Sequence, residues 1–189
     1  KLTIHSSRRR FAARLNSGVR PYMKLLWRLF KRSSEAPAPK RVAIRAGSVI
    51  TEVGAASILH GLFSTISANL EPAGWGSRFP YTMHSLYRGE LQPSDCASAL
   101  RELKEIDEEL SQLPVSQVVW DIDEPTSPPS PYYHLGAGAS NAAEFFVTVN
   151  GLNLLRGGLI DSLESAVEFG HPINIITFSS PADMFVGRA

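Results

Sequence analysis

Residues 74–124 contain the sequence features that best indicate the fold. They begin with Trp75-Gly76-Ser77-Arg78-Phe79-Pro80 and end with Val118-Val119-Trp120-Asp121-Ile122-Asp123-Glu124. Between these two stretches apolar residues recur every three or four positions, as in a helix with one buried face: Leu100, Leu103, Ile106, Leu110 and Leu113. Charged residues fill most of the positions between them. We therefore predict a long amphipathic helix near residues 94–112 with its charged face in solvent.

The flanking sequence predicts the remaining elements. Runs of β-branched and other apolar residues indicate strands near residues 48–53, 115–122, 145–149 and 173–178. Apolar residues at helical spacing indicate two further helices, near residues 55–70 and 153–169, the second ended by Gly170. We therefore predict a single α+β domain with a small sheet of about four strands packed against three helices.

Charge divides the chain into two unequal parts. Residues 1–45 carry 13 of the 19 Lys and Arg residues and one acid, Glu35, whereas the rest carries 6 basic residues and 17 acids. The formal charges are therefore +12 and −11, within a net charge of +1. The hydrophobic content of 43% is typical of a globular domain. The single cysteine, Cys96, excludes an internal disulfide and favours a reducing, cytoplasmic location.

Residues 1–41 are expected to differ from the domain after them. They combine clusters of arginine with one apolar patch and end in a Pro/Ala-rich linker. We interpret them as a basic leader that is disordered or not native to the protein, residues 42–180 as the folded domain, and residues 181–189 as a loose tail. A basic amphipathic arm that binds a membrane surface or a nucleic acid is the alternative for the leader. For the folded domain we expect neither membrane nor nucleic-acid binding.

The acidic string Asp121-Ile122-Asp123-Glu124 is the strongest chemical signal in the chain. Carboxylates after an apolar strand can hold Mg²⁺ for phosphoryl transfer, and the string is similar to the first motif of haloacid-dehalogenase-like phosphatases. The basic partner of that family has no counterpart, because Arg156 and Arg188 are the only basic residues downstream of it. The five histidines have no metal-ligand spacing. We therefore predict no catalytic residue, no metal and no cofactor, with a metal-dependent phosphotransfer or hydrolytic domain using Asp121 and Asp123 as the alternative.

Five short motifs in a fixed order carry a family resemblance. They are Trp75-Gly-Ser-Arg-Phe-Pro80, Leu86-Tyr87-x-Gly89-x-Leu91, Ala99-Leu100-x-Glu102-Leu103-x-x-Ile106, Val118-Val119-Trp120-Asp121-Ile122, and Phe145-Phe146-Val147-Thr148-x-x-Gly151-x-Asn153-Leu154. Together they resemble the immunity protein 70 family of bacterial polymorphic toxin systems, over roughly residues 47–178. The loop of residues 125–134 departs from the resemblance, being richer in Pro and Ser.

The resemblance implies a protein that is not an enzyme and that binds and blocks a cognate toxin domain. The acidic charge of the domain suits a basic toxin, such as one of nuclease type. Aromatic and arginine anchors and acidic partners are the residue types expected at such an interface, and the candidates are Trp75, Arg78, Tyr87, Glu108, Glu109, Trp120, Asp121, Asp123 and Glu124. Core packing is the alternative for the two tryptophans, and a role in fixing its own loop is the alternative for Arg78.

Overall fold

The computed structural model describes residues 40–129, 133 and 136–178. All of them belong to one unit of the chain, Pro39–Ala189. The predicted basic leader of residues 1–41 lies outside the described residues except for its last two positions. The predicted tail of residues 181–189 lies outside them entirely.

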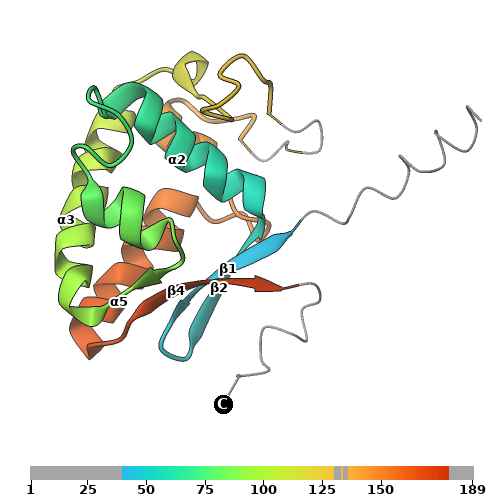
Figure 1. The fold of residues 1–189 in the computed structure, drawn as a ribbon. Coiled ribbons are helices and arrows are strands. Elements are labelled where there is room, and N and C mark those ends of the chain that lie inside the picture. The colour runs from blue at the N-terminus through green and yellow to red at the C-terminus, as the bar shows by residue number, and fades with distance from the viewer. Residues whose placement is uncertain (1–39, 130–132, 134–135, 179–189) are drawn as a thin grey trace, which may run out of the picture. The chain divides into compact units, whose positions relative to one another are not determined.

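A four-stranded antiparallel sheet forms one layer of the domain (Figure 1). Its strands are β1 (Arg41–Ala46), β2 (Val49–Ala55), β3 (Glu90–Leu91) and β4 (Ile173–Phe178), in the spatial order β2-β1-β4-β3. A tight hairpin joins β1 to β2 through Gly47, whose φ of 58° is in the left-handed region that glycine adopts without strain. The first and last strands of the fold, β1 and β4, are therefore neighbours at the centre of the sheet.

Helices cover one face of this sheet, as Figure 1 shows. They are α2 (Ala56–Leu70), α3 (Pro93–Leu110), the short α4 (Ala142–Phe145) and α5 (Asp161–Phe169), with two π-helical segments, η1 (Tyr81–Leu86) and η3 (Leu154–Ile160). The core lies between the helices and the sheet, and its fully buried members include Ile44 of β1, Phe63 of α2 and Leu103 of α3. The predicted α+β class, with a small sheet and three main helices, is confirmed.

Two of the predicted strands are wrong. Residues 115–122 begin with a short 3₁₀ helix, η2 (Val115–Gln117), and continue as an irregular segment. Residues 145–149 begin with the last residue of α4. The N-terminus of this helix is capped by Asn141, whose side chain accepts a hydrogen bond from the backbone N–H of Glu144. Only an isolated bridge between Val147 and Asn153 has strand character there. The sheet instead gains β1 and β3, which the sequence pattern did not reveal.

The irregular segment is held by side chains of α2 in place of a neighbouring strand. The Thr65 hydroxyl donates to the carbonyl of Val119 at 3.0 Å and accepts from the N–H of Val119 at 3.1 Å. The Asn69 amide donates to the carbonyl of Gln117 at 3.0 Å. Backbone groups that leave water need a partner, and here α2 supplies it. This explains how an apolar run of strand-like composition packs without joining the sheet.

We predict that Thr65→Val, which keeps the shape of the fully buried Thr65 side chain, destabilises the domain by about 1–3 kcal/mol, because it leaves two backbone groups of Val119 unpaired. Urea denaturation followed by circular dichroism measures the change. Thr177→Val, at an exposed position of β4, is the matched control, and equal midpoints for the two variants would contradict the role assigned to Thr65.

Candidate functional site

A buried carboxylate shapes the loop that carries Trp75 and Arg78. Glu71, only 5% exposed, follows the last residue of α2. Its two oxygens accept hydrogen bonds from three backbone N–H groups of the loop, those of Gly76, of Arg78 at 3.2 Å and of Phe79 at 2.9 Å. Several N–H donors on one carboxylate satisfy a buried charge. The loop therefore has one fixed course over the end of α2.

Arg78 ties this loop to α3. Its guanidinium bonds to the carboxylates of Glu105 and Glu109 and lies over the ring of Phe79, 4.7 Å from the ring centre. Hydrogen bonds to Glu109 and then to Glu105 raise the pKa of Arg78, and the bond from Arg78 lowers the pKa of Glu109. Two of the predicted partner-binding residues, Arg78 and Glu109, are thus bonded to each other.

Trp75 and Tyr87 form the aromatic part of the site: Tyr87 is exposed, whereas Trp75 is half-buried and packs against the core, as the alternative for this tryptophan expects. Their rings meet edge to face, with centres 4.9 Å apart, above the fully buried ring of Phe63. The Trp75 indole N–H donates to the carbonyl of Met83 at 2.8 Å, which fixes the ring. Tyr87 directly follows η1 and is 37% exposed. Two rigid aromatic side chains are therefore held together at the surface.

His60 of α2 connects these rings to the acidic loop. Its Nδ1 lies 2.9 Å from the Tyr87 hydroxyl, and its Nε2 lies 3.6 Å from Oδ1 of Asp121. Ser64, one turn further along α2, lies 3.4 Å from the same Nε2 and accepts from the N–H of Ile122 at 3.2 Å. We call His60, Trp75, Tyr87, Asp121 and Asp123 the Tyr87 patch.

The charges of the two aspartates act on Tyr87. Burial raises the pKa of Tyr87, and the negative charges of Asp123 and then Asp121 raise it further. The pKa of Asp121 is lowered mainly by the hydrogen bond from the N–H of Asp123, at 2.9 Å, and also by His60. Asp121 thus stays ionised to a lower pH than an ordinary aspartate, and it lies near the exposed phenol of Tyr87.

The other predicted residues lie elsewhere. Trp120 is 8% exposed and packs in the core between Phe146 and Tyr133, with ring centres 6.2 and 5.1 Å away. Glu108 is exposed on α3, and Glu124 is exposed and accepts from the Ser127 hydroxyl at 3.0 Å. The structure therefore brings together four of the predicted residues, Trp75, Tyr87, Asp121 and Asp123.

His60 is the member of the patch that the sequence does not single out. Its position beside the apolar stripe of α2 favours a structural histidine, and its spacing of four residues from Ser64 is the local sign that both face the same side. Its approach to Tyr87 and Asp121 joins residues 27 and 61 positions away in the chain, and no pattern within α2 specifies such contacts.

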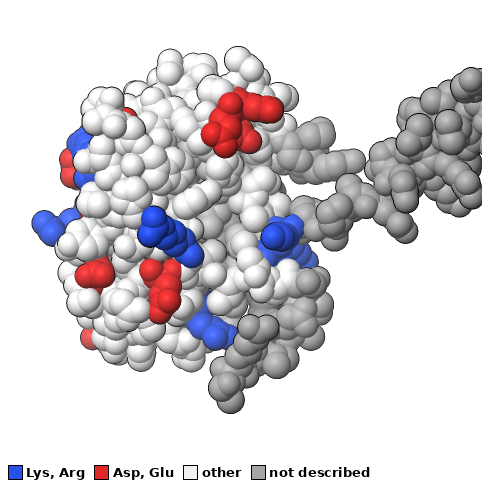
Figure 2. Space-filling model, viewed as in Figure 1, with Lys and Arg blue, Asp and Glu red and all other residues white. Residues whose placement is uncertain are grey.

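Acidic side chains gather beside the patch. Figure 2 shows a group of them near the top of the view, over the place where Figure 1 draws the segment after Trp120, with no Lys or Arg next to it. Within the described part of the chain, no Lys or Arg forms an ion pair with Asp121 or Asp123. The patch therefore combines two aspartates that pair with no described Lys or Arg with one exposed and one half-buried aromatic ring.

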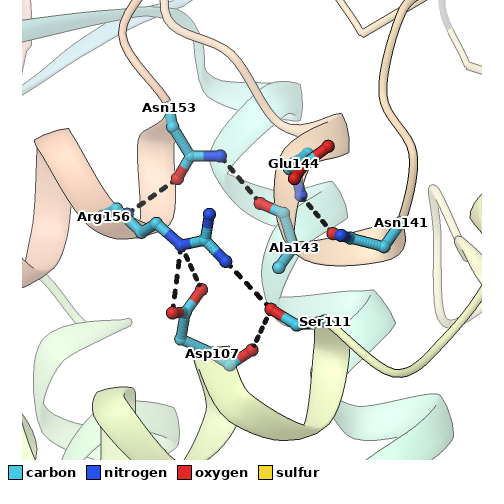
Figure 3. A network of polar contacts seen from close by, with 7 residues as sticks. All are labelled: Asp107, Ser111, Asn141, Ala143, Glu144, Asn153 and Arg156. Carbon is cyan, nitrogen blue, oxygen red and sulfur yellow. Dashed lines mark hydrogen bonds and ion pairs between the residues drawn. The ribbon is translucent and has the colours of Figure 1, made fainter.

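A second polar network, drawn in Figure 3, joins α3 to η3 and α4. The Arg156 Nε donates to both carboxylate oxygens of Asp107, at 2.8 and 3.0 Å, and its Nη2 donates to the Ser111 hydroxyl at 2.9 Å. Asn153 accepts from the N–H of Arg156 at 2.7 Å and donates to the carbonyl of Ala143 at 2.8 Å. Because these polar groups find their hydrogen-bond partners within the network, we interpret it as a contact that positions the helices.

Over residues 40–129, 133 and 136–178, no group of three or more His, Cys, Asp or Glu side chains is placed to hold a metal ion. Asp121 instead bonds within its own loop and faces His60. None of the helices that the structure describes is long and apolar enough to cross a membrane.

The fold and site define a small α+β domain whose distinctive surface feature is a fixed aromatic and acidic patch. The family model for Immunity protein 70 matches residues 44–175, from within β1 to within β4, and the chain belongs to this family. The resemblance seen in the sequence is thereby confirmed. No curated protein and no solved structure gives a significant match to the chain.

We predict that Glu71→Gln destabilises the domain by about 1–3 kcal/mol, because the amide retains one acceptor oxygen and places an NH₂ group against backbone donors. Thermal and urea unfolding measure the loss. Glu108→Gln, which removes the same charge from an exposed position on α3, is expected to change stability little. A Glu71→Gln variant as stable as this control would show that the loop does not depend on the carboxylate.

We also predict that Asp123→Asn lowers the pKa of Tyr87, because a neighbouring negative charge disfavours the phenolate. Ultraviolet absorption during an alkaline titration reports the phenolate, and the difference from a Tyr87→Phe variant isolates the contribution of Tyr87. Glu108→Gln serves again as the control with the same loss of charge. An unchanged Tyr87 pKa in Asp123→Asn would place Asp123 away from the patch in solution.

Proposed function

We propose that this protein neutralises a cognate toxin by binding the toxin domain directly and covering its functional surface. Membership of the Immunity protein 70 family carries the proposal, because the matched residues 44–175 span almost all of the described fold. The family description names an immunity protein, and the mode of action is our inference from the surface. Neutralisation of this kind requires no reaction on the part of the immunity protein.

The charge of the domain supports a basic partner. Residues 46–189 carry 17 acids and 6 basic residues, a formal charge of −11. Three of those basic residues, Arg78, Lys104 and Arg156, are engaged in ion pairs within the fold. Opposite net charges accelerate the encounter of two proteins and orient them. A toxin with a basic active face, such as a nuclease, fits this surface.

We place the centre of the interface at the Tyr87 patch. Interface hot spots are enriched in Trp, Tyr and Arg and are surrounded by contacts of lower energy. The patch offers Trp75 and Tyr87 as rigid anchors, and Glu124 and Glu108 remain candidates for charged contacts around it. Trp120 lies in the core, so we omit it from the proposed surface.

The fixed geometry of the patch favours tight binding. Trp75 is tied to the carbonyl of Met83, and Tyr87 to His60, so little side-chain freedom is lost when a partner docks. A metal-dependent reaction at Asp121 and Asp123 has no observation in its favour. Occlusion by an immobile surface is therefore the mechanism that this site supports best.

We predict that the full chain, co-expressed with the toxin domain encoded beside it, restores growth and co-purifies with that domain. The association rate constant is expected to fall as the salt concentration rises, because opposite charges steer the encounter. Growth assays, affinity co-purification and stopped-flow or biosensor kinetics at several salt concentrations test this. A folded chain that neither rescues growth nor forms a complex would contradict the proposed function.

A further inference from the structure

The Tyr87 patch has the chemistry of a receptor for a positively charged side chain. The exposed faces of aromatic rings attract cations, and carboxylates beside the rings add a direct charge attraction. Here Tyr87 and Trp75 meet at 4.9 Å, and the charges of Asp123 and Asp121 both act on the Tyr87 hydroxyl. His60 lies between the two groups, with its Nδ1 2.9 Å from the Tyr87 hydroxyl and its Nε2 3.6 Å from Oδ1 of Asp121, so the aspartate loop and the Tyr87 ring are neighbours.

Among the described residues, no Lys or Arg forms an ion pair with Asp121 or Asp123 of the patch. The ion-paired arginines and lysine, Arg41, Arg78, Lys104 and Arg156, bind acids on β2, α3 and α5 and none of the patch carboxylates. Asp121 faces the imidazole of His60, at 3.6 Å. We therefore consider a bound molecule as the source of a positive charge that the described residues do not supply.

An arginine matches the patch better than a lysine or a metal ion does. A guanidinium is planar, so it can stack on a ring while its N–H groups bond to carboxylates, whereas an ammonium is a compact point charge. The same chain shows the arrangement at Arg78, which lies over the Phe79 ring while bonding to Glu105 and Glu109. The metal is disfavoured because no three suitable ligands converge among the described residues.

We propose that the Tyr87 patch receives an arginine side chain of the toxin, with its guanidinium against the Tyr87 and Trp75 rings and paired with Asp121 and Asp123. This rests on the proposed function, since it names the chemistry by which the toxin is recognised. The remaining acid of the loop, Glu124, then faces residues that flank this arginine. The arginine is the specificity determinant of the interface.

The first test distinguishes the contribution of the Tyr87 ring to binding from that of the Tyr87 hydroxyl. Dissociation constants are measured between the full chain and the toxin domain encoded beside it, with the toxin inactivated by substitution. Tyr87→Leu, which removes the ring, is expected to weaken binding at least about tenfold, as loss of a hot-spot anchor does. Tyr87→Phe keeps the ring and is expected to change the constant less than about threefold, within the range of non-hot-spot positions.

The second test removes the carboxylates. Asp121→Asn and Asp123→Asn retain an acceptor oxygen, so the loop keeps its bonds while losing charge, and each is expected to weaken binding about tenfold or more. Glu168→Gln removes the same charge from an exposed position on α5 and is expected to change the dissociation constant less than about threefold. Circular dichroism and urea midpoints show that each variant is folded.

The third test identifies the partner side chain by double-mutant cycles. Each interface arginine and each interface lysine of the toxin is replaced by alanine, and the effect of each replacement on the dissociation constant is measured with the wild-type chain and with Asp123→Asn and Asp121→Asn. One arginine is expected to lose most of its effect in the Asp123→Asn background. A complex in which no arginine couples to Asp121 or Asp123, or in which only a lysine does, overturns this inference and leaves the proposed function standing. If the wild-type chain forms no complex, the proposed function itself fails, and this inference fails with it.

Discussion

The carboxylate of Glu71 is the interaction on which both the interior and the surface of this domain depend. It sits where α2 ends and collects three backbone N–H groups from the next turn of chain. The same loop sends Phe79 into the core and Trp75 and Arg78 to the surface. Because buried charge is tolerated only when it is fully hydrogen-bonded, the loop has one course available to it, and that course determines the positions of the three side chains.

Helix α2 also positions parts of the site, through polar side chains that follow one another along the helix. His60 and Ser64 are four residues apart, as are Thr65 and Asn69, so each pair faces one direction. Thr65 and Asn69 hold the irregular segment that leads to Trp120, while His60 and Ser64 meet its continuation at Asp121 and Ile122. One helix thereby buries Phe63 beneath the aromatic rings and positions the aspartates beside them. The position of the patch thus depends on hydrogen bonds from side chains of α2, which take the place of hydrogen bonds to a neighbouring strand.

Local patterns allow the helices to be predicted, and long-range contacts explain what the patterns miss. The spacing of Leu103, Ile106 and Leu110 specifies a buried face, and α3 lies within two residues of its predicted bounds. The run Val118-Val119-Trp120 satisfies the composition of a strand, yet its hydrogen bonds go to Thr65, 54 positions earlier. The same limit applies to the site: residue type suggests Trp75, Tyr87 and the aspartates, but only the fold shows that His60 joins them and that Arg78 is occupied by Glu105 and Glu109.

The ion pairs between Lys or Arg and the acids of the described residues do not include Asp121 and Asp123. Glu105 and Glu109 are matched by Arg78, Asp107 by Arg156, and Glu164 by Lys104, each joining two elements of the domain. Asp121 and Asp123 lie beside the Tyr87 ring and have no Lys or Arg partner among the residues that the structure describes. Asp121 has a local role, because it accepts a hydrogen bond from the N–H of Asp123 and faces His60, but neither role requires a second carboxylate at Asp123. Under the proposal that the patch binds a positively charged group of the toxin, the two aspartates act in binding and the paired acids of α3 belong to the scaffold.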